Sequence, residues 1–194
     1  MGHSRASKQQ THERIVQIAA QRFRELGIDG LSIANLMKEA GLTHGGFYKH
    51  FESRDDLVTE AVTSALASSG SSPHAKRVDS YPTLVDAYLS AEHRDSPGDG
   101  CALSALVCDM GRAPEDARAR YTEQLHGTIA STAKRLPASD DTARAQAIVS
   151  ISAMIGALGL ARAVDDPELS DEIMAVVREH LVAQFAPATQ HDQE

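Results

Sequence analysis

The sequence is poor in the residues that build disulfide-rich or aromatic-rich proteins. It has no Trp, four Phe, four Tyr and two Cys in 194 residues. The two cysteines, Cys101 and Cys108, are seven positions apart, which on a helix separates them by about two turns. That separation is too large for an unstrained disulfide, so we expect no disulfide framework.

Long hydrophobic runs and an apolar leader are also missing. The longest uncharged stretch covers residues 145–161, which is shorter than the roughly 18 to 20 residues of a membrane-spanning helix. Arg5 and Lys8 near the N-terminus are not followed by an apolar segment, so we predict no secretory signal. We expect no transmembrane segment and a cytoplasmic location.

Charge is distributed unevenly along the chain. The formal net charge is -8, yet residues 1–54 hold eight Lys or Arg against five Asp or Glu, and the remaining residues hold 11 against 22. A modestly basic head on an acidic body is expected of a protein that touches DNA with one end. The composition, 42% hydrophobic and 24% charged, predicts a globular protein with at most two units.

Apolar residues recur at spacings of three and four, which predicts an all-α fold. The first expected helix begins at Thr11 and ends at Gly27, with an apolar stripe of Ile15, Ile18, Ala19, Phe23 and Leu26. Ser32 is expected to cap a second helix that ends at Gly41, Thr43 a third that runs through Phe51, and Ser53 with Asp56 a fourth that reaches about Ala67.

A Ser- and Gly-rich stretch, residues 68–82, predicts an exposed connection to the body. Further helices are expected over residues 82–92, 101–111, 114–136, 140–164 and 167–185, with a flexible loop at 94–100. We therefore predict two domains. A three-helix DNA-binding head spans residues 1–55, and a larger helical ligand-binding and dimerisation domain spans residues 56–194.

The most informative segment is residues 31–57, where two short helices meet at Gly41. A glycine-containing turn between a supporting helix and a second helix is typical of a helix-turn-helix. Gly45 and Gly46 in the second helix cost about 1 kcal/mol each relative to Ala, which is understandable if that backbone must approach DNA closely. Phe47 and Phe51 are expected in the core, with residues 48–50 facing outward.

Residues 41–57 read Gly-Leu-Thr-His-Gly-Gly-Phe-Tyr-Lys-His-Phe-Glu-Ser-Arg-Asp-Asp-Leu, and this stretch resembles the signature of the tetracycline-repressor (TetR) family of bacterial regulators. The resemblance covers roughly residues 11–60. It implies a dimeric transcriptional regulator, by default a repressor, that is released from a palindromic double-stranded DNA operator by a small-molecule effector.

The resemblance also implies roles for individual residues. Thr43, His44 and Gly45 would open the recognition helix, Tyr48, Lys49 and His50 would hold the DNA backbone, and Ser32 and Arg54 would be further phosphate contacts. His44 stands where the family often has a basic or polar residue, so the DNA affinity is expected to vary with pH. The alternatives are that Thr43 is only a helix cap and that residues 48–50 are a solvated helix face.

The body is expected to provide the dimer contact and the effector pocket. Residues 147–161 are apolar on most sides, which requires burial, and they resemble the family's penultimate helix, which forms a four-helix bundle across a two-fold axis with the last helix. Candidate pocket residues are Tyr88, Leu103, Leu106, Val107, Met110, Tyr121, Leu125 and Met154, although core packing explains each about as well. The shortage of aromatics favours an aliphatic or small polar effector.

Other function classes receive less support. Cys101 follows a loop at an expected helix start, so a thiol-based redox or electrophile sensor on the same scaffold is an alternative, against a buried small hydrophobe. The histidines lack metal-ligand spacing, and no nucleophile or phosphate-loop motif is present. We therefore expect no enzyme activity, no cofactor and no metal. A helical adaptor that does not bind DNA would leave the cluster at residues 48–50 unexplained.

Overall fold

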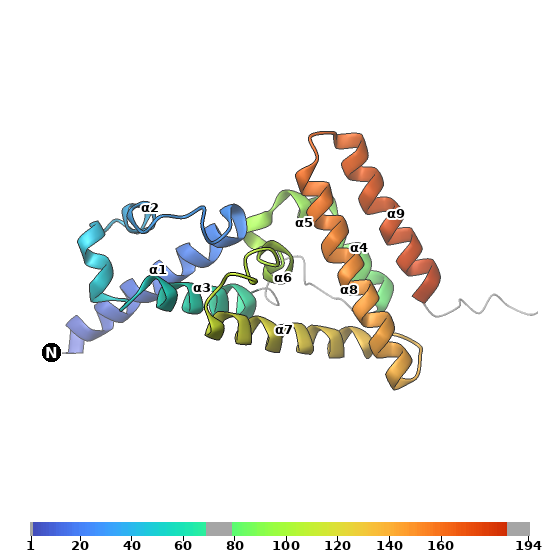
Figure 1. Cartoon of the computed structure of the whole chain (residues 1–194), viewed down its shortest axis with the longest axis horizontal. Coiled ribbons are helices and arrows are strands. Elements are labelled where there is room, and N and C mark those ends of the chain that lie inside the picture. Colours follow the sequence, from blue (N-terminus) through green and yellow to red (C-terminus); the bar gives the residue numbers. More distant parts are fainter. Residues whose placement is uncertain (1, 69–78, 186–194) are drawn as a thin grey trace, which may run out of the picture. The chain divides into compact units, whose positions relative to one another are not determined.

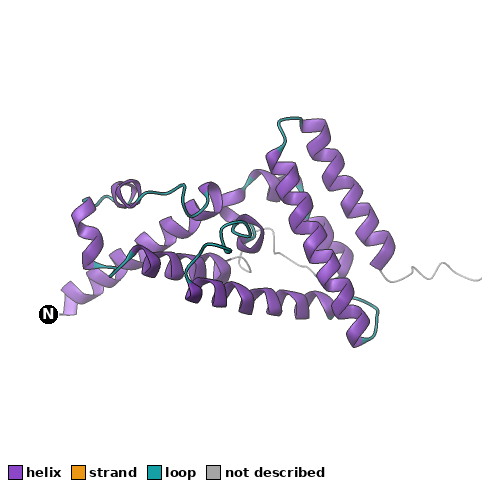
Figure 2. Cartoon of the chain, in the orientation of Figure 1, coloured by secondary structure: helices purple, strands orange, loops and turns teal. Residues whose placement is uncertain are grey.

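The computed structural model describes residues 2–68 and 79–185, and the ordered elements within this part of the chain are all helices (Figures 1 and 2). Two compact units are present. The first comprises the described residues of Met1–Ser72 and Ser96–Gln124, and the second those of Pro73–Asp95 and Leu125–Glu194. The all-α prediction is confirmed.

The first helix of the first unit is longer than expected. α1 (Gly2–Leu26) begins nine residues before Thr11, whose hydroxyl donates to the carbonyl oxygen of Ser7 inside the helix and so caps nothing. Residues 6–10 contain Ala, Lys and Gln, which extend a helix readily. Ile15, Ala19 and Phe23 are buried as predicted, but Leu26 is 56% exposed.

Three residues were predicted to cap the next helices: Ser32 and Ser53 do so, and Thr43 does not. Ser32 caps α2 (Ile33–Glu39) by accepting a hydrogen bond from the Asn35 amide, and Gly27 and Gly41 have the positive φ expected after a helix. Thr43 makes no side-chain cap bond, and the element after it, η1 (His44–Lys49), is a 3-10 helix. The two glycines of η1 explain the missing α-helix.

α3 (Arg54–Ser68) begins with the expected reciprocal cap. The Ser53 hydroxyl accepts from the Asp56 amide, and the Asp56 carboxylate accepts from the Ser53 amide. α3 packs along α1 within the first unit. The proposed domain boundary at residue 55 thus falls at the start of a helix that packs in the head, and the division by function stays a prediction.

Residues 96–124 complete the first unit with η3 (Pro97–Asp99), α6 (Ala102–Ala105) and the first part of α7 (Glu115–Ala133). The predicted helix over 101–111 is wrong, because α6 is a single turn. The Tyr121 hydroxyl donates to the Leu103 carbonyl oxygen at 2.7 Å. In a longer α-helix this carbonyl oxygen would instead accept a hydrogen bond from the amide of residue 107.

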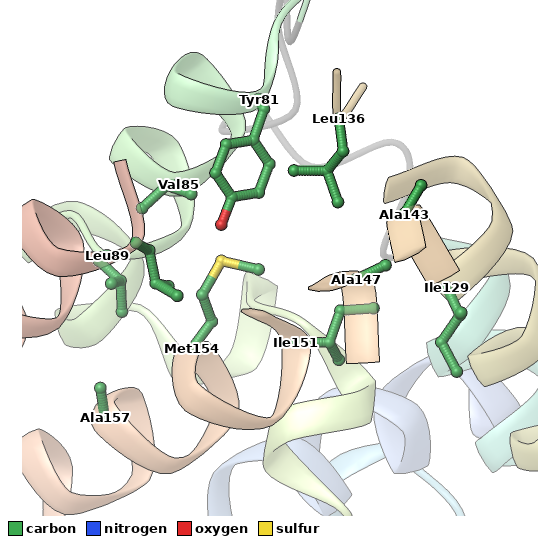
Figure 3. Packing of buried hydrophobic residues seen from close by; sticks show 11 residues of the cluster. Tyr81, Val85, Leu89, Ile129, Leu136, Ala143, Ala147, Ile151, Met154 and Ala157 are labelled. Atoms are coloured by element: carbon green, nitrogen blue, oxygen red, sulfur yellow. The ribbon is translucent and has the colours of Figure 1, made fainter. Parts of the chain in front are cut away.

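The second unit contains α4 (Tyr81–Tyr88), α5 (Ala91–Asp95), α8 (Asp140–Ala163) and α9 (Pro167–Phe185). Its core is a cluster of apolar side chains in which the Tyr81 ring points from α4 toward Met154 of α8 (Figure 3). The Tyr81 hydroxyl, fully buried, lies 2.8 Å from the Ser150 hydroxyl. This bond satisfies a polar group that would be costly to bury alone.

Two predicted segments differ in detail. The helix expected over 82–92 is interrupted, because Ser90 Oγ accepts the His93 amide and starts α5. The expected flexible loop at 94–100 is occupied by the end of α5 and by η3. Most of the connection predicted at 68–82 lies outside the described residues.

α8 is unusually apolar for its length. Among the described residues it is the one helix long and apolar enough to cross a membrane, judged by length and composition alone. One face of α8 packs in the core of the second unit through Ala147, Ile151 and Met154. Such packing is typical of a core helix in a globular protein, so the feature is weak evidence for a membrane span.

Candidate nucleic-acid interface

η1 is held to the head by Phe47 within it and by Phe51 just after it. Phe47 is fully buried and Phe51 nearly so, and their rings are stacked with centroids 5.2 Å apart. Both were predicted core residues, and this is confirmed. Because this buried pair fixes the backbone between them, the polar side chains of that stretch are presented on a rigid support.

The polar residues of this segment face solvent. Tyr48 is 67% exposed, and the edge of its ring packs against Phe47 with the centroids 5.2 Å apart. The other sequence candidates that are exposed here are Ser32, Thr43, His44, Gly45 and Lys49. A rigid exposed tyrosine with a lysine beside it suits hydrogen bonding and charge pairing with phosphate.

His50 does not face outward as predicted. It is half-buried, and its Nδ1 atom is buried with no hydrogen-bond partner among the described residues. Its ring lies 6.2 Å from the ring of His12 on α1. Burial lowers the pKa of His50, and the positive charges of His12, Lys8 and Lys49 lower it further. His50, directly after η1, is therefore harder to protonate than an exposed histidine.

His12 is a residue that sequence reasoning missed. Its Nε2 atom lies 2.6 Å from Glu60 Oε2 on α3, and its ring stacks on Phe51 with centroids 4.6 Å apart. His12 of α1 thus contacts both α3 and the residues that directly follow η1. A signal was present, because His12 stands three residues before Ile15 and seven before Ala19 and so shares their apolar stripe.

Four arginines of the head are used internally. Arg14 donates to the Ala40 carbonyl oxygen at the end of α2, and Arg22 forms a bidentate pair with Glu39 and a contact with Glu25. Arg24 donates to the Gly98 and Ala65 carbonyl oxygens and to Ser68 Oγ.

Arg54 is the fourth arginine, and its predicted phosphate contact competes with bonds inside the head. Its Nη2 and Nη1 atoms donate to the carbonyl oxygens of Ile28 and Leu31 at 2.7 and 3.1 Å, and Asp29 lies 3.7 Å from Nη2. These contacts fasten the turn before α2 to the start of α3. Arg54 therefore serves first to position the helix-turn-helix.

The lysines of the head are not used in this way. Lys8, Lys38 and Lys49 are exposed, and within the described residues no carboxylate lies within ion-pairing distance of them. The positive charge that the head can offer to an anion therefore comes from lysines rather than from these four arginines.

The candidate pocket residues are divided between the two units. Leu103, Leu106, Met110 and Tyr121 are buried in the first unit, whereas Val107 is 45% exposed. Met154 belongs to the core cluster of the second unit, and the partly buried Tyr88 and Leu125 pack against that cluster. A cavity of about 90 Å³ beside Arg54 and an open groove between α4 and α9 are lined by other residues, so the effector site stays a prediction.

The two cysteines lie before and after α6 in the chain. Cys101 precedes α6 and is partly exposed, and Cys108 is exposed. In the part of the chain that the structure describes, no group of three His, Cys, Asp or Glu side chains is placed to hold a metal ion. The polar chemistry of the head is therefore concentrated at η1 and its neighbours.

Comparison with known proteins finds sequence relatives of the first part of the chain. Residues 15–61 match the family described as bacterial regulatory proteins, tetR family. The HTH-type transcriptional regulator AcrR of Shigella flexneri is 35% identical over 52 residues, which are 27% of this chain and 24% of that protein. The uncharacterized HTH-type regulator YvdT of Bacillus subtilis is 34% identical over 55 residues, 28% of each chain. These matches span about a quarter of the relatives' length.

Solved structures extend the likeness to the whole fold. A TetR transcriptional regulator from Chloroflexus aurantiacus has a TM-score of 0.75 at 22% sequence identity. The match covers 93% of this chain and 98% of that regulator's chain. The reduced form of NemR from E. coli has a TM-score of 0.72 at 20% sequence identity, and the match covers 92% of this chain and 99% of the NemR chain. At this level of identity the likeness shows the fold alone.

Proposed function

We propose that the protein, whose residues 15–61 match the bacterial regulatory proteins of the tetR family, is a transcriptional regulator that binds a palindromic DNA operator as a homodimer. A small-molecule effector releases it, and its action is repression in the cytoplasm. The observation that supports this best is the rigid, exposed presentation of Tyr48 and Lys49 between the buried Phe47 and Phe51.

The contacts expected with DNA follow from this geometry. Thr43 and His44 stand at the start of η1 and would reach base edges, while the Tyr48 hydroxyl and the Lys49 ammonium would hold phosphates. Gly45 has open space around its Cα, so the backbone there can approach the duplex closely. Ser32 would donate its hydroxyl proton to a phosphate while its oxygen still accepts from the Asn35 amide.

A second copy of the chain would cover the outer face of α8 and α9. Ile148, Val149 and Leu160 of α8 and Val176 of α9 are between 42 and 58% exposed. Gly156 and Gly159 have open space where a Cβ would stand, which lets another helix approach closely. The exposed positions of α8 between residues 145 and 163 hold no charge, as expected of a self-association surface.

The test is binding of the purified protein to the DNA upstream of its own gene, measured by fluorescence anisotropy at several salt concentrations. We expect salt-sensitive binding that Tyr48→Ala abolishes and Tyr48→Phe weakens. Lys134→Ala, which removes an exposed lysine outside the head, is the control. If the upstream DNA is not bound, selection from random duplexes with the wild-type protein follows, and failure there would overturn the proposal.

A thiol response is a second candidate. Cys101 is partly exposed and follows η3 in the chain. The Gly98 carbonyl oxygen of η3 accepts a hydrogen bond from Arg24 of α1, so modification of the thiol would act near the contact between η3 and α1. One structural neighbour is the reduced form of NemR from E. coli. Release of DNA by a mild oxidant in the wild type and in Cys108→Ser, but not in Cys101→Ser, would support this candidate.

A further inference from the structure

The DNA interface does not have to end at η1, because a lysine of α1 lies next to it. Lys8 stands four residues before His12 on α1, and residues at this spacing share one face of a helix. The His12 ring contacts the two residues that directly follow η1, stacking on Phe51 and approaching His50. Lys8 therefore lies one turn before this contact, on the side of α1 that faces residues 50–51.

The electrostatic effect of Lys8 on His50 also supports a position of Lys8 close to residues 49–50. The charge of Lys8 acts on His50 together with those of His12 and Lys49. The Glu60 carboxylate, which faces His12, is already engaged by the His12 ring at 2.6 Å. Lys8 and Lys49 are therefore two exposed cations whose charges both act on the half-buried His50.

The sequence around Lys8 favours an anionic partner of extended shape. From residue 2 to residue 12, which is the first part of α1, the chain has no Asp or Glu. A duplex that is bound through Tyr48 and Lys49 presents a row of phosphates on each side of the groove. A lysine beside those two residues can meet the next phosphate along the strand.

We propose that the interface extends from η1 onto the first turns of α1, where the Lys8 ammonium binds a backbone phosphate that flanks the groove entered by η1. The proposal rests on the proposed DNA-binding function. Lys8 acts on affinity and not on sequence choice, because phosphate contacts carry no base information. The His12–Glu60 pair positions this part of α1 by joining it to α3.

The experiment compares the salt dependence of binding for the wild type, Lys8→Ala, Lys8→Arg and Lys134→Ala, with the operator selected by the wild-type protein and with a scrambled duplex. Loss of one phosphate contact lowers the slope of log affinity against log salt by about 1 per protomer. We expect this loss for Lys8→Ala on both duplexes, and wild-type slopes for Lys8→Arg and Lys134→Ala.

A wild-type slope for Lys8→Ala, with binding intact, overturns the inference and leaves the proposed function standing. If the wild-type protein binds no duplex, the proposed function itself fails, and a partner of another class replaces DNA. A second readout needs no DNA. In an NMR titration, removal of the Lys8 charge should raise the pKa of His50, and an unchanged His50 titration would contradict the placement of Lys8.

Discussion

The guanidinium of Arg24 donates a hydrogen bond to the carbonyl oxygen of Gly98, with Nε and O 2.5 Å apart. The same side chain reaches the end of α3 through Ala65 O and Ser68 Oγ. Burial lowers the pKa of Arg24, and Asp99 and Glu25 oppose that effect. One residue at the end of α1 thus joins α3 and η3 within the first unit.

Replacement of Arg24 should weaken the contacts of α1 with α3 and η3. We expect Arg24→Ala to lower the free energy of unfolding by about 1 to 3 kcal/mol, because buried carbonyl oxygens lose a charged donor. Urea denaturation followed by circular dichroism measures the change. Lys134→Ala should leave stability within about 0.5 kcal/mol of the wild type, and an equally stable Arg24→Ala would show that those contacts contribute nothing.

Arg54 should behave as a positioning residue of the helix-turn-helix. Its two nitrogens donate to two different carbonyl oxygens, Ile28 O and Leu31 O, a geometry that the single ammonium of lysine cannot reproduce. We expect Arg54→Lys to destabilise the protein almost as much as Arg54→Ala, by about 1 to 3 kcal/mol. If Arg54→Lys is fully stable but binds DNA weakly, the predicted phosphate contact is the main role instead.

The success and failure of these predictions have physical causes. Caps are local, so the roles of Ser32, Ser53 and Gly41 could be predicted from a few neighbouring residues. α1 began earlier than expected because Thr11, a good cap in isolation, lies within a run of residues that favour helix. His12 and Arg24 act through partners 48 and 74 residues away, and such contacts depend on tertiary packing that a single sequence does not specify.

The stability of the head should depend on pH through His50. Its pKa in the folded protein is lowered from its ordinary value near 6.5, first by burial and then by His12, Lys8 and Lys49. As the pH falls through 6.5, the unfolded chain binds a proton that the folded protein resists, so folding stability decreases until the lower folded pKa is passed. Thermal unfolding at a series of pH values should show this loss.

The matched variant for this measurement is His50→Gln, which keeps a polar side chain and cannot titrate in this range. Its stability should fall less steeply than that of the wild type between pH 6.5 and the folded pKa of His50. Identical pH profiles for the two proteins would contradict the assignment of the effect to His50.

Self-association should depend on the apolar outer face of α8. Val149 is 54% exposed in the single chain, so Val149→Glu should not disturb the core of the second unit, yet it would place a carboxylate in the proposed interface, where an unpaired charge is costly. We expect the dimer dissociation constant, measured by analytical ultracentrifugation, to rise at least about thirtyfold, the factor that corresponds to a loss of about 2 kcal/mol.

The control for this measurement is Val107→Glu, because Val107 is 45% exposed but lies outside α8 and α9. A wild-type protein that is monomeric would contradict the proposed dimer, and a Val149→Glu variant that dimerises like the wild type would show that another surface makes it. In the first case the two heads could not be held on a two-fold axis, and the palindromic operator would have to be abandoned with the dimer.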